Sequence, residues 1–113
     1  MPPYSQYVTT KKPLSEETQM KRKEGEDITV LVKSSTAATS LGSMLARSIY
    51  EGKRVTLRAV GASAVNQAAK SIAIAQGFAG PRGHDLWVKP HFFDSDIAGK
   101  KVTGVAFRVV DHA

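Results

Sequence analysis

Two cations lie where a β-branched segment of the sequence gives way to small residues. Lys33 ends the segment "DITVLVK" and precedes Ser34 and Ser35, and Arg58 lies near the end of "KRVTLRAV", shortly before Gly61. If each segment is a strand that leads into a helix, unbonded backbone N–H groups and the positive end of a helix dipole lie close to each cation. Such donors beside a cation favour the binding of phosphate. Gly61 either permits the tight turn or lets a ligand approach the backbone closely.

A second basic group falls in a short polar stretch near the C-terminus. Lys100 and Lys101 end "SDIAGKK", which we expect to form a hairpin loop over residues 95–101. The loop is interpreted either as an arm that reaches along a nucleic acid or as a solvated turn of mixed charge. The nearby Asp94 and Asp96 favour the second interpretation.

The sequence lacks the residue patterns of the common catalytic and metal sites. It has no cysteine, which excludes disulfides, thiolate metal ligands and cysteine catalysis. "GAS" is similar to the start of a nucleophile elbow, but Val65 stands where the second glycine is required. No nucleotide-binding glycine motif is present, and the histidines have no metal-ligand spacing. We therefore predict a protein that is not an enzyme and holds no metal or cofactor.

Charge is distributed unevenly along the 113 residues. Residues 1–27 hold five basic and five acidic side chains, so the whole formal charge of +6 lies in residues 28–113. A basic domain predicts an anionic partner, most often DNA or RNA. No apolar run reaches the roughly 20 residues of a membrane span, and the N-terminus lacks the apolar region of a signal peptide. These features favour a soluble cytoplasmic protein without a membrane partner.

Hydrophobic periodicity predicts the elements that would position these cations. We expect strands at 27–33, 53–60, 84–94 and 101–111, with helices over 34–52 and 62–77. In this β-α-β-α-β-β order, the strand–helix–strand crossover makes the first two strands parallel, and the last two form an antiparallel hairpin. The predicted fold class is an α/β two-layer sandwich, a mixed four-stranded sheet with two helices on one face. Both strand-to-helix junctions would then lie at one edge of the sheet.

The residue types also predict local details of these elements. The first strand is apolar enough to be buried on both faces, and Pro90 indicates an edge strand or a bulge. Four aromatic residues could stack on bases if they are exposed, but most of them are expected in the core, with Trp87 the least certain: Trp87, Phe92, Phe93 and Phe107. Gly77 would end the helix over 62–77. Candidate caps of the first helix are Ser34, Ser35 and Thr36. The expected inward faces are Leu41, Met44, Leu45, Ser48 and Ile49; Val55, Leu57 and Ala59; and Val65, Ala68, Ala69, Ile72 and Ala73.

Two segments suggest contacts with other chains. Residues 1–27 form an N-terminal tail with a short helix predicted over 15–24, and such a tail could join the protein to a larger assembly. The helix over 62–77 is rich in alanine and nearly uncharged. Its small side chains suit a homodimer contact, or they reflect only the high helix propensity of alanine.

The segments "VKSS", "AVGASAVNQAAKSIAIAQGF" and "GPRGHDL" resemble the stage V sporulation protein S family, a branch of the Alba-like superfamily. The resemblance covers about residues 28–111. It implies the β-α-β-α-β-β fold for the domain over 28–113, homodimers or larger assemblies, and nucleic-acid binding through the two junctions and a basic hairpin arm. Carried over to this sequence, it implies the binding residues Lys33, Ser34, Ser35, Arg58, Gly61, Ser63, Lys100 and Lys101.

The leading hypothesis is a non-catalytic DNA- or RNA-binding protein that acts as a homodimer or larger assembly. Its affinity would come mainly from phosphate contacts, with peripheral support from Arg54, Lys70 and Arg82. The alternative is a structural or adaptor subunit that uses the same fold for protein–protein assembly. The third hypothesis is the binding of a small molecule or an anion at the two helix N-termini.

Overall fold

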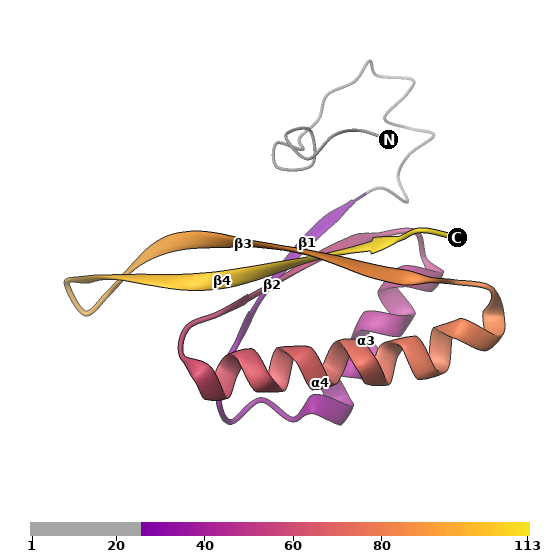
Figure 1. Ribbon diagram of the computed structural model, residues 1–113, viewed down its shortest axis with the longest axis horizontal. Coiled ribbons are helices and arrows are strands. Elements are labelled where there is room, and N and C mark those ends of the chain that lie inside the picture. Colours follow the sequence, from indigo (N-terminus) through magenta and orange to yellow (C-terminus); the bar gives the residue numbers. More distant parts are fainter. Residues whose placement is uncertain (1–25) are drawn as a thin grey trace, which may run out of the picture.

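The computed structural model describes residues 26–113 and confirms the predicted fold class. Residues 1–25 of the tail, including the helix predicted over residues 15–24, lie outside the described residues. The elements are β1 (Asp27–Val32), α3 (Ala38–Tyr50), β2 (Arg54–Ala59), α4 (Ala62–Ala79), the 3₁₀ turn η2 (Gly80–Arg82), β3 (Leu86–Ile97) and β4 (Lys100–Asp111). Both helices lie on one face of the sheet, and the other face carries no helix of residues 26–113 (Figure 1).

The four strands form one mixed sheet in the order β1-β2-β4-β3. β1 and β2 are parallel, with Val32 opposite Ala59, while β4 runs antiparallel to both β2 and β3. β3 is thus an edge strand, which confirms one of the two interpretations of Pro90. β1 is the other edge, and its burial alternates because helices cover only one side. The expectation that β1 is buried on both faces is wrong, and Leu31 is 58% exposed.

The core lies between the sheet and the two helices. Val55, Leu57 and Ala59 are fully buried, as their alternation in β2 predicts, and Leu45 of α3 is buried above them. The predicted inward face of α3 holds, except that Met44 is only partly buried. Small residues set the spacing of the helices, because a Cβ on Gly42 would lie 2.6 Å from Cγ2 of Ile74.

The buried face of α4 differs from the predicted one. Ala69 and Ala73 are exposed, while Val65 and Ile72 are only partly buried. The buried residues are Ala64, Ala68, Ser71, Ala75 and Ala79. α4 contacts α3 as well as the sheet, so its close-packed side is the one with the smallest residues.

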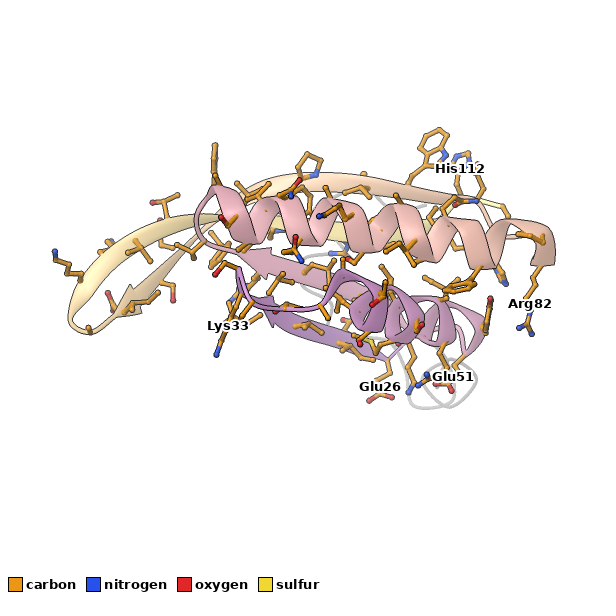
Figure 2. All side chains as sticks on the ribbon, turned by 90° about the horizontal axis from the view of Figure 1, so that it is seen from below. Glu26, Lys33, Glu51, Arg82 and His112 are labelled. Atoms are coloured by element: carbon orange, nitrogen blue, oxygen red, sulfur yellow. The ribbon has the colours of Figure 1, made fainter. Side chains whose placement is uncertain are left out.

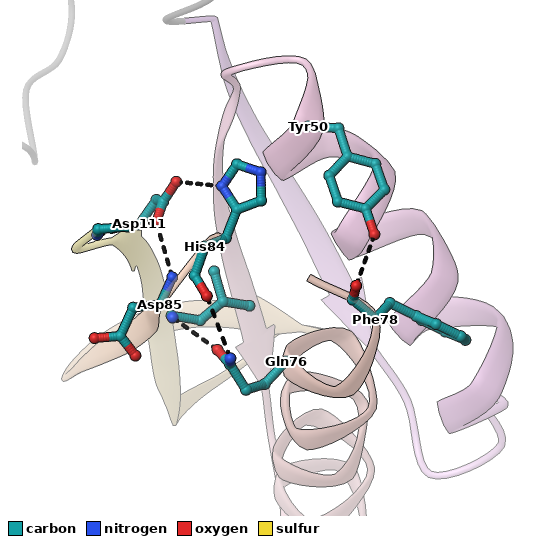
Figure 3. A network of polar contacts seen from close by, with 8 residues as sticks. Tyr50, Gln76, Phe78, His84, Asp85 and Asp111 are labelled. Atoms are coloured by element: carbon teal, nitrogen blue, oxygen red, sulfur yellow. Dashed lines mark hydrogen bonds and ion pairs between the residues drawn. The ribbon is translucent and has the colours of Figure 1, made fainter. Parts of the chain in front are cut away.

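α4 also extends beyond the predicted stop at Gly77. It ends at Ala79, where the N–H of Gly80 donates to the carbonyl of Gln76. The chain turns at Gly83, whose φ of 91° is the left-handed conformation that favours glycine. The amide of Gln76 holds this corner: Nε2 donates to the carbonyl of His84, and Oε1 accepts from the N–H of Leu86 (Figure 3).

The C-terminal hairpin is longer than predicted. The loop expected over 95–101 is reduced to Ala98 and Gly99, both with positive φ, because the ladder continues to the pair Ile97–Lys100. Such a two-residue turn matches the twist of the flanking strands. β2 pairs with β4 only from Val105 onward, so residues 93–104 project beyond the sheet as a hairpin arm. Five residues of β4 give the arm a length of about 17 Å.

Candidate nucleic-acid interface

The first junction is an exposed loop that hydrogen-bonds to itself. The backbone N–H of Lys33 donates to Oγ1 of Thr36 over 2.8 Å, and the N–H of Thr36 donates to the carbonyl of Lys33 over 3.0 Å. Ser34 and Ser35 are exposed in the turn between them. Within residues 26–113 the Lys33 side chain forms no ion pair, and it projects outward from the molecule (Figure 2).

The second junction leaves the N-terminus of α4 without a side-chain cap. Gly61 is the N-cap residue with a φ of 94°, and the first turn, which includes the exposed Ser63, holds no acidic residue. A Cβ on Gly61 would meet nothing within 4 Å. The backbone conformation requires glycine here, and the space above it is open, so both interpretations of Gly61 remain.

The two helix N-termini do not meet at the sheet edge, which corrects the prediction. α3 begins at Ala38 after the N-cap residue Ala37, and none of the predicted serine or threonine caps forms. The loop before it passes under α4, where Nε2 of Gln67 donates to the carbonyl of Thr36 over 2.7 Å. α3 therefore starts beside the middle of α4 (Figures 1 and 2). Residues 33–35 and 61–63 remain together at this edge of the sheet, and we call them the junction rim. Of the two helices, only α4 begins there.

Arg58 is exposed on the opposite face of the sheet from the helices. The alternation of β2 places it away from Leu57 and Ala59, so it does not lie beside the N–H groups of α4. Its guanidinium carbon is instead 4.7 Å from the centroid of the Phe93 ring, over the face of that ring. The sequence already predicts this orientation of Arg58, because neighbouring residues on one strand point to opposite faces of the sheet.

Lys100 and Lys101 lie at the end of the hairpin arm. Both are exposed, and neither takes part in an ion pair among residues 26–113. Asp96 lies opposite Lys101 in the ladder, whereas Asp94 accepts a hydrogen bond from Thr103. The arm projects from the same end of the sheet as the junction rim, because β4 runs antiparallel to β2 (Figure 1).

The prediction that most of the aromatic side chains are buried is wrong. Phe92 is 78% exposed, and Trp87 is 53% exposed. Phe93 and Phe107 are half-buried. The reason is geometric, since β3 is an edge strand: Trp87 lies on the face without a helix, and Phe92 lies at the base of the part of β3 that extends beyond β2.

A polar cluster at the other end of the hairpin was not predicted. His84 Nδ1 lies 2.7 Å from Oδ2 of Asp111, whose Oδ1 accepts from the N–H groups of Asp85 and Ala113 (Figure 3). Partial burial acts to raise the pKa of Asp111, but these hydrogen bonds outweigh it and hold the pKa below its ordinary value. Pairing of β3 with β4 brings together residues 27 positions apart, and the sequence gives no local signal of it. Within the described part of the chain, no group of three potential ligands could hold a metal.

Comparison with known protein families matches residues 28–112 to Stage V sporulation protein S (SpoVS). The chain belongs to this family. The match covers both helices and all four strands except Asp27, the first residue of β1, and agrees with the resemblance of the two junction segments. The mixed sheet with two helices is the Alba-like fold expected for a SpoVS protein. No helix in residues 26–113 has the length and apolar character needed to cross a membrane.

Proposed function

We propose that this SpoVS protein is a non-catalytic nucleic-acid-binding protein that holds DNA or RNA mainly through phosphate contacts. The observation that carries the proposal is the convergence of cations on one end of the sheet. Lys33 of the junction rim and Lys100 and Lys101 of the arm lie at this end, without ion pairs among residues 26–113. The uncapped N-terminus of α4 adds backbone donors and a positive dipole end.

The shape of this end supports contacts with an extended polyanion. The arm reaches about 17 Å beyond the last pair between β2 and β4. A phosphate chain along the arm would therefore continue onto the junction rim. The proposal includes action as a homodimer or larger assembly in the cytoplasm.

Exposed apolar groups support the assembly part of the proposal. Ala69 and Ala73 lie on the outer face of α4, where both are exposed. Phe92 of the neighbouring strand is the most exposed of the large apolar side chains described. A second copy of the chain would bury these groups. The same surface supports the alternative, in which the fold serves as an adaptor between proteins.

The test measures the salt dependence of binding. Fluorescence anisotropy of labelled single-stranded RNA and duplex DNA is recorded at several salt concentrations for the wild type, Lys33→Ala and Lys100→Ala/Lys101→Ala. Each lost phosphate contact should reduce the slope of log K against log salt by about 1, equally for all sequences. Arg47→Ala is the matched control, because Arg47 is exposed in the last turn of α3, near the opposite end of β2.

Two results would contradict the proposal. One is sequence-selective loss, or no loss, of affinity in the lysine variants, and the other is no affinity of the wild type for either nucleic acid at low salt. The second result, with a dimer or larger species in a parallel sizing experiment, would favour the adaptor.

A further inference from the structure

The sheet face without a helix is strongly basic. Residues opposite each other in a ladder share a face, so the register assigns Arg54, Arg58, Lys89, Lys100 and Arg108 to this open face. Arg58 and Lys100 are exposed, Arg54 and Lys89 are half-buried, and Arg108 is only 5% exposed. Of the acidic residues in the four described strands, only Asp27 points the same way, and it pairs with Arg54 over 2.7 Å. The face therefore offers a polyanion two exposed cations, Arg58 and Lys100.

A flat surface lies in the middle of this charge. The Phe93 ring rests on the backbone of Gly104, where a Cβ would come within 2.5 Å of two ring carbons. The Arg58 guanidinium then lies over the ring, 4.7 Å from its centroid. Phe93 is half-buried and Arg58 is exposed, so the planar guanidinium is the more accessible member. We call Arg58, Phe93 and Gly104 the stacking platform.

Apolar groups surround the platform on the same face. Leu31 lies beside Arg58 in the ladder and is more than half exposed. Trp87, about 20 Å away along β3, is also exposed, and its ring stacks on His112 at 3.7 Å. Cations that alternate with flat or apolar surfaces suit a ligand that carries both phosphates and unpaired bases.

We infer that the open sheet face binds single-stranded nucleic acid, with an unpaired base stacked on the Arg58 guanidinium over Phe93. This inference rests on the proposed function and adds a second mode of contact to it. Bases of a duplex are stacked inside the helix, so a duplex can reach the phosphate contacts but not the platform. Guanidinium planes and aromatic rings both accept unstacked bases.

The experiment compares two labelled strands that differ only in their bases. One is a thymidine strand of about twelve nucleotides, within the usual site sizes of single-strand binders, and the other is an abasic strand with the same phosphates. Binding of the full chain is measured by fluorescence anisotropy at low salt. One stacked base should make the wild type bind the thymidine strand about tenfold more tightly than the abasic strand.

The variants Arg58→Lys and Phe93→Leu separate stacking from charge. Arg58→Lys keeps the positive charge and loses the plane, so the preference should fall to about onefold to twofold while affinity for the abasic strand stays unchanged. Phe93→Leu should do the same. Because Phe93 packs on Gly104, the folding of Phe93→Leu is checked by circular dichroism. If that variant is unfolded, the result for Arg58→Lys alone decides the test. Lys100→Ala/Lys101→Ala should weaken both strands in parallel.

The outcomes distinguish this inference from the proposed function. A wild type that binds both strands equally, or an Arg58→Lys variant that keeps the full preference, would overturn the platform and leave phosphate binding intact. A wild type that binds neither strand nor a duplex would overturn both.

Discussion

The substitution Gly42→Ala tests the contact between the two helices. A Cβ at this position would lie 2.6 Å from Cγ2 and 2.8 Å from Cβ of Ile74, and 3.0 Å from the carbonyl oxygen of Ser71. Two of these three atoms, Cβ of Ile74 and the Ser71 oxygen, are not the far end of a flexible side chain, so α3 and α4 must move apart. Overpacking of this kind costs about 1–3 kcal/mol, whereas glycine to alanine within a helix contributes about 0.5–1 kcal/mol of stability. We expect a net loss of about 1 kcal/mol.

Gly77→Ala is the matched control, because it makes the same change inside α4 where nothing lies within 4 Å of the new Cβ. It should raise stability by about 0.5–1 kcal/mol. Urea unfolding followed by far-ultraviolet circular dichroism gives both values. A net loss of 1 kcal/mol should lower the melting temperature by about 4–8 °C. If Gly42→Ala proves as stabilising as Gly77→Ala, the helices do not pack as closely as the structure shows.

Two further substitutions test the polar cluster and the second junction. The pKa of Asp111 is lower in the folded protein, so its stabilisation is complete above the ordinary pKa near 4 and is lost as the pH falls through the folded value. Asp111→Asn should lower the urea midpoint at pH 6, and the midpoint of the variant should decrease less between pH 6 and pH 3 than that of the wild type. Parallel curves of midpoint against pH for the two proteins would contradict this. Gly61→Ala forces alanine to a φ of 94° and a ψ of 154°, a conformation adopted almost only by glycine, and should cost about 1–3 kcal/mol in urea unfolding. Unchanged stability with weakened nucleic-acid binding would instead show that Gly61 serves ligand approach.

The sequence predicts those parts of the fold in which side-chain size and polarity alternate clearly. In β2, large apolar residues such as Leu57 alternate with charged residues such as Arg58, so both faces were assigned correctly. Pro90 marked an edge strand because it cannot donate to a ladder. The two helices were placed by their periodicity and by the glycines near their ends.

The buried side of α4 could not be predicted in the same way. Ala68 is buried and Ala69 is exposed, although the two residues are chemically identical. A helix with so little contrast has no preferred face until a neighbour selects one, and here the neighbour is α3 at Gly42. The length of the arm was predicted wrongly for a related reason. Polar residues such as Asp94 and Asp96 indicated a loop, whereas the ladder of β3 and β4 continues through them.

The candidate site was predicted by residue type better than by arrangement. Lys33 and the arm lysines lie at one end of the sheet, but the prediction grouped Arg58 with them by its position in the sequence. The Arg58 side chain points to the open face of the sheet instead, as the alternation of β2 requires. Phe93 was named among the aromatic residues that could stack on bases if exposed, but the core was preferred for it, because an aromatic residue in a strand is more often buried.

The open face and the junction rim are close enough to act on one strand of nucleic acid. Leu31 pairs with Arg58, and Lys33 follows Leu31 by two residues, about 7 Å further along the same line. A strand that places a phosphate at Lys33 would therefore carry its next bases over the stacking platform. A duplex would meet only the first of these contacts, because its bases are paired. The two sets of variants then have different signatures: loss of Lys33 weakens both kinds of nucleic acid, whereas loss of the Arg58 plane weakens only the single strand.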